Sequence, residues 1–180
     1  MTSDPKVSEA YVWAWLPDQT KPVVAGLLSK HGDQLVFNYG RSYLERKDAI
    51  SLYEPELPLR SGVLTLLDGL SMPNCIRDAA PDAWGRRVIL NRKFGARGKE
   101  IDAGSVDELT FLLESGSDRI GALDFQQSPS VYVSREGKGA SLDELLNAVA
   151  LVEAGTPLTP ELEHALFHGS SIGGACPTAA

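Results

Sequence analysis

The sequence predicts an α+β fold, with a small β-meander or barrel-like sheet first and helices after it. Short aromatic and β-branched runs separated by turn residues fill the stretch from residue 10 to residue 39. From Pro81 onward the apolar residues recur at helical spacing instead. Capping patterns also precede several of these later runs. A sheet followed by helices is the pattern of an α+β protein.

Three strands are predicted in the N-terminal stretch, at residues 11–16, 23–28 and 35–39. Turn residues separate them, at 17–19 and at 31–33. Consecutive short strands joined in this way form a meander, which closes into a small sheet or barrel. Trp13 and Trp15 fall on one face of their strand, and core packing explains this better than a ligand platform.

The middle of the chain is less regular. Residues 50–59 are expected to hold another short strand followed by proline-broken segments, and residues 63–70 fit either a strand or a helix. Two further strands are expected at 120–125 and 131–133. Serine, glycine and proline are frequent between residues 126 and 139. We therefore expect an N-terminal subdomain at 1–126 and the start of a second one at 127–180.

A first helix is expected to begin with Pro81 and to end at Gly95, with Trp84 and Val88 on one face. Ser105 and Glu108 have the spacing of a capping box, ahead of a helix that would stop at Gly116.

Ser141 and Glu144 repeat the capping-box spacing before the next helix. Its expected apolar stripe consists of Leu142, Leu145, Leu146, Val149 and Ala150. A last short helix would be capped by Thr159 and end at Gly169.

Composition limits the protein class. Of the 180 residues 43% are hydrophobic, as in a globular protein, and no apolar run is long enough to span a membrane. The N-terminus lacks the apolar segment of a secretory signal, and two distant cysteines fit a reduced, cytoplasmic protein. The net charge of −7 argues against direct nucleic-acid binding by the whole chain.

A basic patch interrupts this acidic background. It consists of Arg86, Arg87, Arg92, Lys93, Arg97 and Lys99. A solvated helix face is the favoured interpretation, and a contact to acidic protein or to nucleic acid is the alternative.

Few residues have the spacing of a catalytic or metal site. His164 and His168 lie four apart, so both rings could face one side of a helix, but two histidines make at most half of a tetrahedral site. His31 has no nucleophile in its context. Carboxylate pairs such as Asp107 and Glu108 fit helix capping. We therefore predict no catalytic residue and no metal ligand.

The stretch from Gly169 to Thr178 reads GSSIGGACPT and is rich in glycine. Successive backbone N–H groups in such a turn can converge on an anion, as in loops that hold nucleotide phosphates. It lacks the spacing of a P-loop and follows a helix rather than a strand. A frayed terminal tail is the alternative interpretation.

Three motifs together resemble those of HipA-like proteins. Residues 77–87 read RDAAPDAWGRR, similar to the family's D-x-x-P-D-x-W-G-R segment, and residues 118–125 read DRIGALDF, similar to its D-x-x-G-A-L-x-F strand. The glycine-rich stretch at 169–178 resembles the family's G-S-S-x-G-G-A-R-P-K loop. The motifs occur in family order and cover most of the chain.

The resemblance implies a Ser/Thr kinase toxin of a toxin–antitoxin pair, whose partner is a small helix-turn-helix antitoxin. It also implies that residues 127–180 begin a kinase-like N-lobe. The loop would lie over the phosphates of ATP, bound with Mg²⁺, through Ser171, Ile172, Gly173, Gly174, Ala175 and Cys176. Ser171 matches the family's autophosphorylated serine.

The chain also departs from the family pattern. Cys176 and Thr178 stand where the family has arginine and lysine. The phosphate-pairing lysine, the catalytic aspartate and asparagine, and the metal-binding aspartate lie downstream in the family. Phosphoryl transfer depends on such charged groups and on metal. We therefore expect a HipA-like fragment truncated at its glycine-rich loop, catalytically incomplete, with ATP and Mg²⁺ not bound productively.

A stand-alone, non-catalytic subunit is the alternative hypothesis. Such a subunit would bind a kinase or a helix-turn-helix antitoxin in trans. The nucleotides after the coding region discriminate the two, because a fragment would be followed by the remainder of a kinase and a subunit by a separate kinase gene.

Overall fold

The computed structural model describes residues 7–117, 119, 121–135, 142–154, 156, 158, 159 and 162. These residues belong to two compact units, each of which is described by itself below. The first unit runs to Ala79 and includes Gly121–Val133, and the second comprises Ala80–Ile120 and the chain from Ser134 onward. Whether residues 127–180 begin a kinase-like N-lobe stays a prediction.

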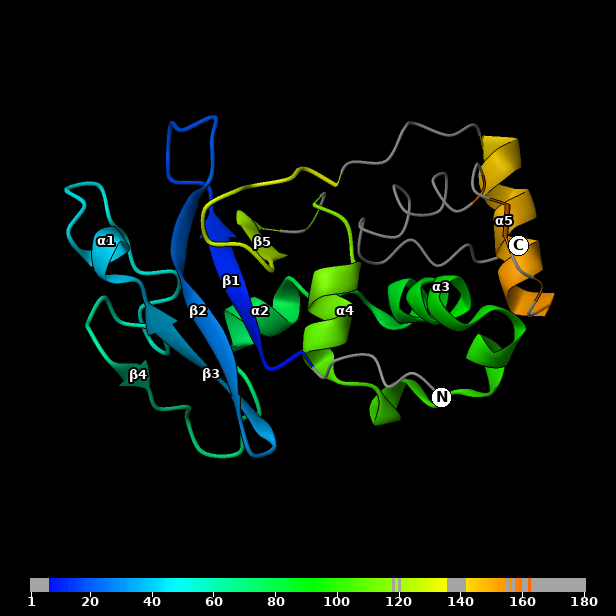
Figure 1. The fold of residues 1–180 in the computed structure, drawn as a ribbon, viewed down its shortest axis with the longest axis horizontal. Coiled ribbons are helices and arrows are strands. Elements are labelled where there is room, and N and C mark those ends of the chain that lie inside the picture. The colour runs from blue at the N-terminus through cyan, green and yellow to red at the C-terminus, as the bar shows by residue number, and fades with distance from the viewer. Residues whose placement is uncertain are drawn as a thin grey trace. The chain divides into compact units, whose positions relative to one another are not determined.

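A five-stranded antiparallel sheet forms the centre of the first unit (Figure 1). Its strands are β1 (Glu9–Ala14), β2 (Val23–His31), β3 (Gln34–Tyr39), β4 (Val63–Leu64) and β5 (Leu123–Gln126). The spatial order is β4-β3-β2-β1-β5, so β1, β2 and β3 form the predicted meander and β4 and β5 are its edges. Together with the helices, this sheet confirms the α+β class and the three N-terminal strands.

One face of the sheet is buried across four strands. The row Leu64–Phe37–Leu28–Ala10 follows the strand register, and each of its side chains is at most 1% exposed. Next to this row, Tyr39 of β3 stacks on Tyr43 of α1 (Arg41–Leu44) with ring centroids 5.6 Å apart. Burial of large apolar side chains at cross-strand positions is what holds a small sheet together.

Gly26 permits a close approach between β2 and β3. A Cβ atom at Gly26 would lie 2.2 Å from the Asn38 carbonyl oxygen and 2.6 Å from the Phe37 ring. The pairing of β1 with β2 also shifts register between Val12 and Trp13, next to this glycine. Only a residue without a side chain fits at this point of the sheet.

The second unit is helical where it is described. It contains α3 (Ala83–Phe94), η1 (Gly95–Glu100), η2 (Ala103–Ser105), α4 (Glu108–Glu114) and α5 (Leu142–Ala154). One apolar cluster joins Val88 of α3 to Ala148 and Val152 of α5, with Trp84 packed against it. Another joins Ile89 and Leu90 to Phe111 of α4. The predicted sharing of one face by Trp84 and Val88 is thus confirmed.

The helix starts differ from those that were predicted. α3 begins at Ala83 and not at Pro81, and the carboxylate of Asp82, directly before it, accepts the Gly85 N–H at 2.8 Å. Asp107 caps α4 by accepting the Leu109 N–H at 3.1 Å, so Ser105 and Glu108 do not form a capping box. The first N–H groups of a helix have no carbonyl partner within the helix. An aspartate directly before the first turn accepts one of them, and its position therefore favours a helix start at the next residue.

The expected apolar stripe of α5 is confirmed at Val149, which packs against the cluster shared with α3, but not at Leu146 and Ala150; the side chains of Leu142 and Leu145 lie outside the described ones. Ala148 and Val152 are buried against α3, whereas Leu146 is 51% exposed and Ala150 also faces solvent. The predicted stripe followed the most apolar residues of the helix, but packing selected the face with the smaller residue Ala148.

Three further regions of the first unit differ from the prediction. Residues 50–59 contain a single bridge, between Tyr53 and Leu57, in place of a strand. Residues 131–133 belong to no strand, and the side-chain amide of Gln126 accepts the Val133 N–H and donates to the Val133 carbonyl. The short helix α2 (Asn74–Asp78) was not predicted.

Among the described residues, no helix is long and apolar enough to cross a bilayer.

Candidate functional site

The glycine-rich loop lies outside the described residues. This applies to all six predicted phosphate contacts, Ser171, Ile172, Gly173, Gly174, Ala175 and Cys176, and to His164 and His168. Their proposed roles stay predictions. The chain before them agrees with the expected cap, because Thr159 Oγ1 accepts the Leu162 N–H at 3.4 Å.

Residues 77–87 run from α2 into α3, and two of their charged side chains, Asp82 and Arg86, help to build the second unit. Arg86 forms a fork with Glu108, the first residue of α4, through two hydrogen bonds of 2.7 Å. Its Nε donates to the Pro81 carbonyl at 3.2 Å, and its guanidinium lies 4.7 Å from the centre of the Phe111 ring. A bidentate arginine–carboxylate pair fixes both position and orientation. The motif thus joins the N-terminal ends of α3 and α4.

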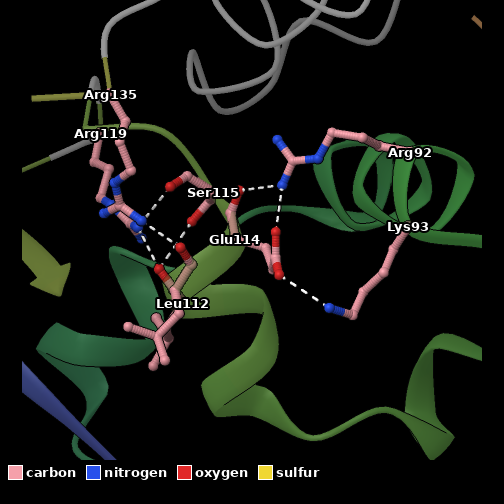
Figure 2. A network of polar contacts seen from close by, with 8 residues as sticks. Arg92, Lys93, Leu112, Glu114, Ser115, Arg119 and Arg135 are labelled. Atoms are coloured by element: carbon pink, nitrogen blue, oxygen red, sulfur yellow. Dashed lines mark hydrogen bonds and ion pairs between the residues drawn. The ribbon is translucent and has the colours of Figure 1, made fainter. Parts of the chain in front are cut away.

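A second set of charges joins the C-terminal ends of the same two helices (Figure 2). Arg92 donates to both the carboxylate and the carbonyl of Glu114, each at 2.7 Å, and Lys93 donates to the carboxylate at 3.0 Å. Burial raises the pKa of Glu114, but the hydrogen bonds and charges of Lys93 and Arg92 outweigh it and hold the pKa below its usual value.

Two more arginines reach the end of α4 from the opposite side in Figure 2. Arg119 donates to the carbonyls of Leu112 and Ser115, and Arg135 donates to the carbonyl of Leu113. These are carbonyls of the last helical turn, which have no partner within the helix. Positive charge at a helix C-terminus is favourable, so the arginines stabilise this short helix.

Half of the basic patch is therefore explained within the fold, and the side chain of Lys99 lies outside the described ones. Arg86, Arg92 and Lys93 have carboxylate partners on α4, while Arg87 and Arg97 are exposed. The predicted solvated helix face fits Arg87 and Arg97, whereas the partners of Arg86, Arg92 and Lys93 were not predicted. A repeat in the sequence could have revealed them, because Arg86 and Arg92 are six residues apart, as are Glu108 and Glu114.

A different kind of surface lies on the first unit. Five large apolar side chains between residues 50 and 67 are between 39% and 54% exposed, namely those of Ile50, Tyr53, Leu59, Val63 and Leu67. We call these five residues the apolar surface. Val63 belongs to β4, an edge strand of the sheet. The five residues fall within one stretch of the sequence, and exposed apolar side chains that form one patch are typical of protein–protein contacts.

Two buried tyrosines hold the backbone beneath the apolar surface. The hydroxyl of Tyr39 accepts the Leu52 N–H at 2.9 Å and donates to the Leu57 carbonyl at 2.7 Å. The hydroxyl of Tyr43 donates to the Ile50 carbonyl at 2.9 Å. Burial raises the pKa of both phenols, so both hydroxyls keep their protons. The loop that carries Ile50 and Tyr53 is thereby fixed by its own core.

The buried carboxylate of Glu56 also holds the loop at residues 50–59 in place. Glu56 is 8% exposed and accepts the backbone N–H and the side-chain amide of Asn74, at 2.6 and 2.5 Å. Asn74 is the first residue of α2, so Glu56 fixes the loop to that helix. Desolvation, with the charge of Glu56, raises the pKa of Cys75 to about 11, so its thiol is unreactive at neutral pH.

Other candidate residues have ordinary surroundings. His31 is exposed at the end of β2. Within the part of the chain that the structure describes, no group of three or more histidine, cysteine or acidic side chains could hold a metal ion.

Comparison with known proteins identifies the family. The family model of the HipA N-terminal domain matches residues 14–126, a range that contains β2 to β5, α1 to α4 and the whole apolar surface. A search of curated proteins gave no match. Because the family model covers more than half of the chain, this protein belongs to the HipA-like family, as its three motifs indicated.

Proposed function

We propose that this chain is a non-catalytic, protein-binding N-terminal part of a HipA-like toxin–antitoxin kinase system. The observation that carries the proposal is the apolar surface, which lies inside the matched N-terminal domain. A helix-turn-helix antitoxin is the partner that we propose, and a separately encoded kinase subunit is the alternative.

The hydrogen bonds that fix the backbone at Ile50, Leu52 and Leu57 support a binding role. Loops lose conformational entropy when they are fixed by a partner, and a loop that its own core already holds avoids much of this cost. The hydroxyls of Tyr39 and Tyr43 provide this hold beneath Ile50 and Tyr53. Tyrosine is also enriched among the residues that contribute most to binding energy.

The surroundings of the surface fit a protein partner better than an anionic one. Arg41 pairs with Glu45 at 2.9 Å, and Arg46 pairs with Asp48 at 2.9 Å. Arginines that are paired with carboxylates attract phosphate groups less than unpaired ones do. An apolar centre with paired charges nearby is the usual composition of a protein interface.

The role of residues 77–87 supports the non-catalytic part of the proposal. Asp82 caps α3, and Arg86 pairs with Glu108. Both are thus used to position helices, and a catalytic group would have to reach substrate instead. ATP and Mg²⁺, the cofactors of kinases in the family, are on this proposal not used productively by this chain.

The test is a titration by calorimetry of the chain with a helix-turn-helix protein encoded next to it. The variant Ile50→Ser/Tyr53→Ser should lose at least about tenfold in affinity, equal to about 1.4 kcal/mol, because two apolar contacts are lost. A separately encoded kinase subunit, titrated in parallel, distinguishes the two partners.

The matched control is Val131→Ser/Val133→Ser. These valines are 59% and 57% exposed on the same unit but outside the apolar surface. The control should bind like the wild type. Equal affinities for wild type and the Ile50→Ser/Tyr53→Ser variant would refute the role of the surface.

A further inference from the structure

We draw no further inference here: the strongest candidate, the cluster of Arg92, Lys93, Arg119 and Arg135 at the C-terminal end of α4, already binds the carbonyls of that helix and Glu114, and nothing else at the cluster points to a ligand.

Discussion

At the scale of single residues, much of the charge in the second unit stabilises helices. Asp82 and Asp107 cap α3 and α4, Glu108 pairs with Arg86, and Glu114 pairs with Arg92 and Lys93. The motif that identifies the family therefore has an architectural explanation. Asp82, Gly85 and Arg86 each have a contact that places α3 or joins it to α4.

The network at Glu114 predicts a pH dependence of stability. The pKa of Glu114 in the folded protein lies below its ordinary value of 4.5. The ionised carboxylate therefore contributes fully to the free energy of unfolding above pH 4.5, and this contribution is lost as the pH falls through the lower pKa of the folded state. The variant Glu114→Gln lacks this contribution at every pH. We expect urea unfolding to show a difference in stability at pH 7 that shrinks below pH 4.5.

Glu45→Gln serves as the control for this measurement. Glu45 also pairs with an arginine, but both partners are well exposed, so water screens the pair. Its removal should change stability little at either pH. A difference between wild type and Glu114→Gln that stays constant from pH 7 to pH 3 would contradict the proposed role of the network.

At the scale of elements, the sheet depends on the close approach of β2 and β3. Gly26→Ala should destabilise the protein by about 3 kcal/mol, because its Cβ would lie 2.2 Å from a backbone oxygen that cannot move without disturbing the strand pairing. Gly40→Ala is the matched control, since its nearest neighbour would be 3.7 Å away. Thermal unfolding of the two variants measures the difference, and equal melting temperatures would rule out the predicted clash.

Some strands of the first unit could be predicted from the sequence, and other segments could not. The strands β1, β2 and β3 were predictable because aromatic and β-branched runs are separated by clear turn residues. The region of residues 50–59 was not, because several of its backbone groups bond to the hydroxyls of Tyr39 and Tyr43, outside the region. Sequence patterns report only on residues that are near one another along the chain, whereas these hydrogen bonds to tyrosine hydroxyls form only in the folded core.

The same limit applies to the candidate site. The motif at 77–87 was recognisable, but nothing local marks its partner Phe111. Its partner Glu108 is indicated only by the spacing that Glu108 and Glu114 share with Arg86 and Arg92. The apolar surface was not predicted either, because Ile50, Tyr53 and Leu59 are residue types that are usually buried. Their exposure is known only from the folded structure.

At the scale of the whole molecule, this protein belongs to the HipA-like family, and we propose that it binds a protein partner and does not catalyse phosphoryl transfer. Purified chain incubated with Mg-ATP is therefore expected to release no phosphate and to carry no phosphate on Ser171. Transfer would need charged groups and metal placed around the phosphates. Mass spectrometry of the peptide that contains Ser171 is the measurement, and a phosphorylated peptide would show that the chain has kinase activity of its own.

The most direct test of the account is hydrogen–deuterium exchange of the chain, free and saturated with the helix-turn-helix protein. Amides that a partner covers exchange more slowly in the complex. We predict added protection in residues 50–67 and unchanged exchange at residues 131–133. Protection that leaves residues 50–67 unchanged and appears elsewhere would contradict the assignment of the apolar surface as the binding site.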